Sequence, residues 1–298
     1  MTTFLQLLIA GLALGAVYAL IALGFTVIYR SSRVINFAQG QLLALGAFLT
    51  SWLVLSDHLS FWIAFLIAAL STAVIALIFQ SGVLRFAVGK PEFTIVMLTL
   101  GLAAILQSVI PSAFGTNPRS NGDPWGSSAA QFAGLSLPWV EIWTIISAIA
   151  VLLLFAAFNR LTRYGLAMRS AAVDPEAALA AGIPLRRVYA TSWVLAGLVA
   201  CIGGVFLGGY PNGVDPTIAN TALIAFPAII LGGIDSTTGA IIGGFIIGVV
   251  QELTAGYQPQ YASFLGTNFY LVAPYIVMIL VLLVRPNGLF GSRPAERL

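Results

Sequence analysis

Hydrophobic residues fill long continuous blocks of this chain, and short polar segments separate the blocks. A helix that crosses a membrane needs about 20 predominantly apolar residues. We predict nine such helices, with a range of eight to ten, over residues 4–28, 34–56, 61–84, 92–112, 141–158, 188–210, 218–234, 237–256 and 269–285. A transmembrane β-barrel would alternate apolar and polar residues instead. The pattern therefore predicts an all-α integral membrane protein, a polytopic helical bundle.

Some of these helices are expected to be irregular. Block 34–56 begins with polar residues, so it forms either a full span or a partly re-entrant segment. Blocks 218–234 and 237–256 are short, and a glycine-dense turn separates them. Glycines four residues apart, such as Gly244 and Gly248, let membrane helices touch closely. We therefore predict one transmembrane domain over residues 1–298 that contains some broken or re-entrant helices.

The composition of the chain excludes several classes of function. The chain is 59% hydrophobic and 8% charged, whereas soluble domains carry about 25% charged residues. A water-soluble enzyme is therefore excluded. Because the chain has one cysteine and one histidine, Cys201 and His58, it can form neither an internal disulfide nor a His/Cys metal cluster. We predict no catalytic residue, no metal site and no enzymatic activity.

The basic residues predict an orientation. With the N-terminus outside and nine spans, only Arg119 falls outside. The others are then cytoplasmic, in agreement with the positive-inside rule: Arg30, Arg33, Arg85, Lys90, Arg160, Arg163, Arg169, Arg186, Arg187, Arg285, Arg293 and Arg297. The C-terminus is then cytoplasmic. The net charge of +3 reflects this topology, so we predict a lipid bilayer as partner and no nucleic acid.

The predicted spans lack the groups that drive transport in many carriers. Their middles contain no Asp, Glu, Lys, Arg or His, and Glu141 and Glu252 map to span ends. This absence argues against a proton-coupled carrier, although not against a sodium-coupled one. The nearest approach to a phosphate-binding loop, residues 82–90, has the wrong spacing. Energy for active transport would therefore enter through a partner.

The longest cytoplasmic loop, residues 159–187, contains signals for a short helix. Asp174 is a predicted N-cap, Pro175 fits the first helical position, Glu176 suits the positive helix end, and Gly182 provides a left-handed stop. A helix this short is marginal in water. We expect it either to bind another protein surface or to lie at the lipid headgroups.

The outer loop, residues 113–140, is the longest on its side. It is rich in Gly, Ser, Pro and Asn and carries Arg119, Asp123 and Trp125. Loops of this length without regular structure are usually functional or disordered. We predict either a docking surface for an external protein or a mobile cover.

The amides of Asn36, Gln39 and Gln41 lie just inside the second block. Polar groups in lipid must find partners. These side chains therefore either line a path for solute or bond a neighbouring helix.

Five segments together carry a family resemblance: GAVYALIALG at 15–24, VINFAQG at 34–40, residues 174–183, LGGIDS at 231–236 and RPNGLFG at 285–291. In this order they resemble the inner-membrane permeases of branched-chain amino-acid ABC importers, of the LivH type. Gln39 stands where that family usually has His. Glu176, Ala177 and Ala178, followed by Gly182, also match the start of the E-A-A loop of importer permeases.

The resemblance implies roles for three groups of residues. The first couples the permease to an ATPase: Asp174, Pro175, Glu176, Ala177, Ala178, Gly182 and Ile183. The second lies near the translocation path: Asn36, Phe37, Gln39, Gly40 and Gln41. The third comprises outer docking candidates: Arg119, Asp123 and Trp125.

The resemblance also implies partners and a location. They are a second related permease, two cytoplasmic ATPases that carry ATP and Mg, and an extracytoplasmic substrate-binding protein. This chain itself would bind no cofactor and would reside in a bacterial inner membrane.

The resulting hypothesis is inward transport of branched-chain amino acids or a related small solute by alternating access. Other amino acids, urea, short amides and aromatic acids remain open as substrates. One alternative is a passive channel for urea or another small neutral solute, and another is a membrane anchor without transport. A channel has no need of a capped cytoplasmic helix, which favours the importer.

Overall fold

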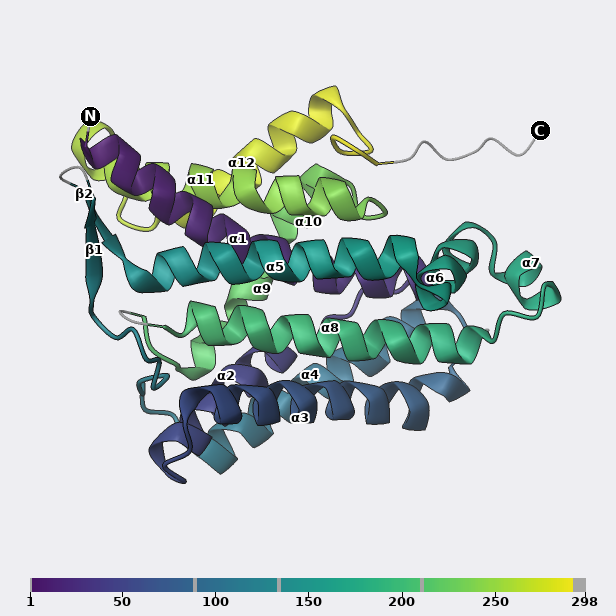
Figure 1. Cartoon of the computed structure of the whole chain (residues 1–298). Helices are drawn as coiled ribbons and strands as arrows, with labels where there is room; N and C mark the ends of the chain where they lie inside the picture. Colours follow the sequence, from purple (N-terminus) through teal and green to yellow (C-terminus); the bar gives the residue numbers. More distant parts are fainter. Residues whose placement is uncertain (1, 88–89, 133–134, 210–211, 292–298) are drawn as a thin grey trace.

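The computed structural model describes residues 2–87, 90–132, 135–209 and 212–291 (Figure 1). The predicted Arg293 and Arg297 lie outside these residues. Six described helices are long and apolar enough to cross a membrane: α1 (Thr2–Ser32), α3 (Phe61–Gly82) with the 3-10 turn Leu84–Phe86, α4 (Glu92–Phe114), α5 (Trp139–Leu161), α8 (Leu185–Leu207) and α11 (Thr237–Tyr261). This confirms a polytopic helical membrane protein.

Three further apolar segments are shorter: α2 (Gln39–Leu55), residues 216–232 and α12 (Phe269–Val284). Each predicted block overlaps one of these nine segments. The number of membrane crossings and the orientation remain predictions.

The irregular regions fall largely where the sequence placed them. Helix α2 starts only at Gln39, after a non-helical stretch in which Arg33 has a positive φ of 57°. Block 218–234 is broken into a 3-10 helix (Pro216–Asn220), α9 (Thr221–Ile224) and α10 (Phe226–Gly232). Pro216 and Pro227 each stand in the first turn of a piece, because proline cannot donate within a helix.

Block 237–256, by contrast, was predicted too short. Helix α11 has 25 residues and continues to Tyr261, through a polar end that hydropathy alone excludes. The amide of Gln258 holds this end by donating to the carbonyls of Ala262 and Gly266, at 2.9 and 3.0 Å. As a result Glu252, predicted at a span end, lies inside α11.

The outer loop contains regular structure that the sequence did not reveal. Strands β1 (Ala129–Phe132) and β2 (Leu135–Pro138) form an antiparallel hairpin, with Ala129 opposite Pro138. This hairpin was not predicted, and apart from it the described elements are helices, in agreement with the expected helical bundle. The strands are four residues long and lack β-branched residues, so they carry no strand signal.

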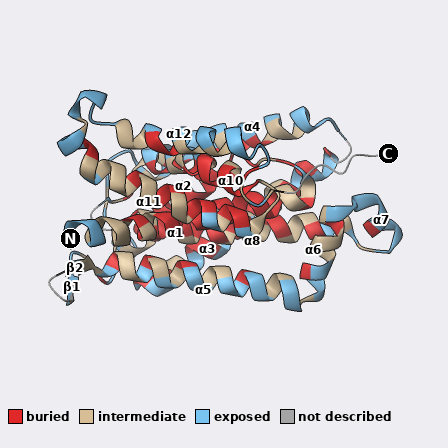
Figure 2. Cartoon of the chain, turned by 90° about the horizontal axis from the view of Figure 1, so that it is seen from above, coloured by how far each residue is buried: buried red, intermediate tan, exposed pale blue. Residues whose placement is uncertain are grey.

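Helix α1 forms the centre of the bundle, where buried residues concentrate (Figure 2). Its glycines face those of α11. A Cβ added to Gly248 would lie 2.2 Å from the backbone nitrogen of Gly15, and one added to Gly244 would lie 2.5 Å from that of Ala19. The interpretation of the α11 glycines as packing positions is therefore confirmed, because no larger side chain fits this close approach.

The two ends of the bundle differ. The N-terminus lies at the same end as the hairpin, whereas α6 (Arg163–Val173) and α7 (Pro175–Ala180) project at the opposite end (Figure 1). Helix α6 was not predicted. The described C-terminal residues return to α10, where the amide nitrogens of Leu289 and Phe290 donate to Leu231 and Gly232 at 2.8 and 3.1 Å.

Candidate functional site: the capped helix and the polar segments

Helix α7 has the caps that the sequence predicted. The Asp174 carboxylate accepts hydrogen bonds from the backbone nitrogens of Glu176 and Ala177, at 2.9 and 3.0 Å. Pro175 is the first helical residue, and Gly182 has a φ of +83°. After this left-handed residue, the chain can turn directly into α8. The helix itself, Pro175–Ala180, has six residues.

One face of α7 packs on the protein and the other does not. Ala178 is buried, and Ile183 packs partly buried against the same cluster as Met168 of α6 and Val188 of α8. The opposite face is exposed, including Glu176, and 59% of the Leu179 side chain is accessible. Figure 1 shows α7 at the tip of the molecule. The helix is thus fixed from one side only, which leaves a surface available to a partner.

The amides of Asn36 and Gln39 are completely buried. The Gln39 amide nitrogen donates to the carbonyl of Ala196 in α8 at 3.2 Å, and the Asn36 amide nitrogen donates to the Gln39 side-chain oxygen at 3.2 Å. A Cβ on Gly24 of α1 would lie 2.1 Å from the Gln39 nitrogen. Gln39 thus bonds a neighbouring helix in this structure, because its amide joins α2 to α8, and Asn36 bonds Gln39.

The rest of this segment lies at the same junction. The backbone nitrogen of Phe37 donates to Thr99 of α4 at 3.4 Å. A Cβ on Gly40 would lie 2.3 Å from the carbonyl oxygen of Ala219, and Gln41 is half-buried. Segment 36–41 thus meets four other elements of the bundle. Its role in translocation remains a prediction.

The Gln39 bonds provide a test of this junction. Gln39→Leu keeps the side-chain size but leaves the Asn36 amide and the Ala196 carbonyl without their partner. A buried polar group that loses its partner costs about 1–3 kcal/mol. We expect a clear fall in the thermal unfolding temperature in detergent. Gln41→Leu, two residues along the same helix, is the matched control. Equal unfolding temperatures for the two variants would show that the Gln39 bonds do not stabilise this junction.

The outer docking candidates have different surroundings. The Arg119 guanidinium donates to the Phe114 carbonyl, and its backbone pairs with Val214. The Asp123 carboxylate accepts from the Gly126 nitrogen at 3.0 Å. Both residues are half-buried and hold the loop in shape.

Trp125 is buried, which the sequence did not indicate. Its ring stacks on Phe206, with centroids 5.8 Å apart, and on Trp143, at 6.0 Å. Phe61 meets it edge-on at 5.4 Å. Trp125 therefore anchors the loop in an aromatic cluster, and the accessible part of this loop lies elsewhere. Its partners come from three other helices, so no local signal in the sequence could have identified them.

Residues 7–282 match the family described as "Branched-chain amino acid transport system / permease component". The chain belongs to this family. It is a family of transport permeases and not of enzymes. The resemblance drawn from the five sequence segments is thereby confirmed.

Individual relatives agree with this assignment. The permease is 31% identical to the high-affinity branched-chain amino acid transport system permease protein LivH of Salmonella typhimurium, over 99% of this chain and 97% of LivH. It is also 25% identical to the permease protein LivM of the Escherichia coli high-affinity branched-chain system, over 95% of this chain and 70% of LivM. In fold it resembles PsaBC from Streptococcus pneumoniae, with a TM-score of 0.51 at 15% identity over 95% and 92% of the two chains.

Proposed function

We propose that this chain is the transmembrane permease subunit of an ABC importer that moves branched-chain amino acids, or a related small solute, inward by alternating access. The one-sided packing of α7 carries this proposal. A short helix with both ends capped, fixed to α6 and α8 and exposed on its outer face, suits the transfer of a partner's movement into the bundle. Residues Asp174, Pro175, Glu176, Ala177, Ala178, Gly182 and Ile183 form this coupling element.

The similarity to both LivH and LivM of the Escherichia coli high-affinity branched-chain amino acid transport system supports a second, related permease as pore partner. Two cytoplasmic ATPases, which hold ATP and Mg, would bind α7. An extracytoplasmic binding protein would deliver substrate at the end that carries the hairpin. We place the assembly in a bacterial inner membrane, with the N-terminus outside. A passive channel is disfavoured, because it has no use for a capped cytoplasmic helix.

The proposal is tested by purification of the tagged protein from its native membrane in mild detergent, followed by mass spectrometry. We expect a second permease and ATPase subunits to copurify. The double variant Glu176→Lys, Gly182→Pro should lose the ATPases but keep the second permease, since only the cytoplasmic contact changes. Recovery of the chain alone, or only as a homo-oligomer, across several detergents would favour the channel.

A further inference from the structure

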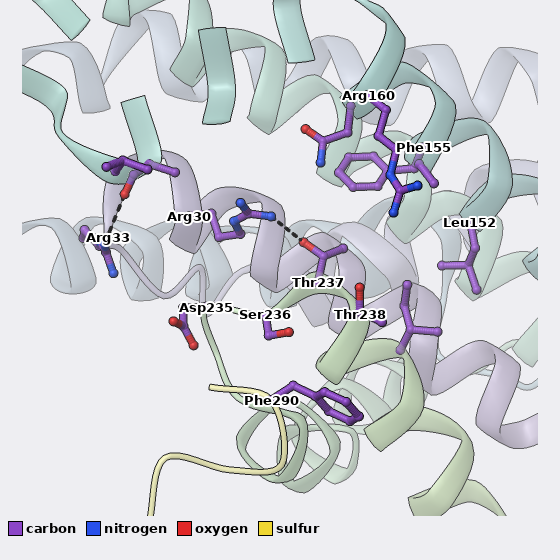
Figure 3. A pocket seen from close by; sticks show the side chains of 15 residues that line it. Arg30, Arg33, Leu152, Phe155, Arg160, Asp235, Ser236, Thr237, Thr238 and Phe290 are labelled. Atoms are coloured by element: carbon purple, nitrogen blue, oxygen red, sulfur yellow. Dashed lines mark hydrogen bonds between the residues drawn. The ribbon is translucent and has the colours of Figure 1, made fainter. Parts of the chain in front are cut away.

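A cavity of about 550 Å³ opens at the end of the bundle that carries α7 (Figure 3). The ends of α1, α5 and α6 and the start of α11 enclose it. Its lining has two parts, one basic and polar and the other apolar. The polar part comprises Arg30, Arg33, Asn159, Arg160, Asp235, Ser236, Thr237 and Thr238.

Positive charge dominates the polar part. Arg30, Arg33 and Arg160 line the cavity, and Asp235 is the acidic residue among its described lining. Arg30 donates to the Thr237 hydroxyl at 3.0 Å, and Arg33 donates to the Ala172 carbonyl at 3.1 Å, so both guanidinium groups are held in place (Figure 3). Asp235 offsets part of this positive charge, and a bound anion would offset more of it.

A further arginine and the N-terminus of a helix add to the positive charge around the cavity. Arg169 borders an adjoining space with Arg30 and donates to the Asn159 carbonyl at 2.6 Å. Helix α11 begins at Thr237, with Ser236 as its N-cap, and the positive end of its dipole faces the same region. Hydroxyl groups and guanidinium groups together form the donor set that phosphate oxygens accept from.

One wall of the cavity is apolar. Leu152, Phe155 and Ala156 of α5 and Ile241 of α11 form this wall. Leu153, beside this wall, is 64% exposed, and Ile149, one turn before it in α5, is 46% exposed, so the apolar surface continues along the outside of α5 beyond the cavity. A soluble anion needs no such wall. A phospholipid needs both parts, one for its headgroup and one for its acyl chains.

We propose that this cavity binds the phosphate group of an anionic phospholipid of the inner leaflet. The phosphate lies among Arg30, Arg33 and Arg160, near Thr237, and the acyl chains follow the apolar face of α5. Basic pockets between transmembrane helices on the cytoplasmic side bind anionic headgroups in this way. The lipid would join the ends of α1, α5 and α11, and this site is separate from the proposed coupling element.

The test uses the full chain in nanodiscs of phosphatidylcholine, with phosphatidylglycerol as the probe. We expect phosphatidylglycerol to raise the unfolding temperature and to remain bound in native mass spectrometry. Arg30→Gln combined with Arg160→Gln should weaken its retention by roughly tenfold or more. The control, Arg85→Gln combined with Arg163→Gln, removes the same charge from exposed positions at the same end and should retain the lipid.

Three results would overturn the assignment. Equal loss of phosphatidylglycerol in both double variants would indicate a general charge effect. Equal stabilisation by inorganic phosphate in pure phosphatidylcholine would assign the cavity to a soluble anion. Release of the lipid when the ATPases and the second permease bind would assign it to a protein partner. Arg30→Lys is a control for misfolding. It changes the same residue but keeps the positive charge, so it should retain most of the lipid.

Discussion

Gly182→Pro is expected to reduce substrate uptake at least tenfold while leaving the permease folded in the membrane. Gly182 has a φ of +83°, whereas proline is restricted to a φ near −65°. Proline would also remove the N–H that donates to the Leu179 carbonyl at 2.9 Å. The end of α7 and its path into α8 would therefore change. Under the proposed function, closure of the ATPases would no longer reach the bundle.

Gly266, far from α7, offers a closely matched control. Gly266 has a φ of +84°, donates to the Ser263 carbonyl at 3.2 Å and, like Gly182, has open space around it. Gly266→Pro therefore imposes the same backbone change far from α7. The measurement is uptake of radiolabelled leucine, together with ATP hydrolysis, in proteoliposomes that contain the partner subunits. We expect at least a tenfold loss of uptake for Gly182→Pro alone, which corresponds to roughly 1.4 kcal/mol in the activation free energy of transport.

Glu176→Lys is a second test of the same surface. It places a positive charge at the positive end of the short helix and reverses the charge of the exposed face. ATP hydrolysis without uptake is the expected result. Unchanged uptake in either α7 variant, or equal loss in Gly266→Pro, would contradict the role of α7 in coupling.

Features of this fold that depend on neighbouring residues were predictable from the sequence. The caps of α7 depend on Asp174, Pro175 and Gly182, which act within one or two turns. The hydrophobic blocks located the apolar helices for the same reason, because each block is a run of neighbouring residues. Helix α6 was missed because its sequence, RYGLAMRSAAV, is not strongly apolar, although Thr162 caps its start by accepting from the Gly165 nitrogen at 3.0 Å. Burial of Met168 and Ala171 against other helices stabilises it.

Features that depend on distant contacts were not predictable. The amide of Gln39 bonds Ala196, which is 157 residues away, so the sequence left its role open. Trp125 stacks on Phe206, which also lies far from it in the sequence. The arginines of the cavity were recognised as topological signals, but nothing local indicates that α1 and α5 bring Arg30 and Arg160 to one space. Packing between distant segments determines which partners these side chains meet.

Gly248→Leu is expected to have the largest effect on stability. A Cβ at this position would lie 2.2 Å from the Gly15 nitrogen and 2.3 Å from its Cα, both backbone atoms that cannot move aside without separating α1 from α11. Overpacking of a core typically costs about 1–3 kcal/mol, and a clash with backbone lies at the upper end or beyond. Because α1 occupies the centre of the bundle, the whole fold should loosen.

Cys201 provides the measurement, since it is the single cysteine of the chain and is completely buried. A Cβ on Gly46 of α2 would lie 2.6 Å from the Cys201 Cα, so a thiol dye can reach this residue only when the bundle opens. Gly248→Leu should accelerate labelling and lower the temperature at which it occurs. Gly101→Leu in α4, where a Cβ meets nothing within 4 Å, should label like the parent protein. If both variants label alike, α1 and α11 cannot be in backbone contact, and the glycines of α11 must serve something other than packing.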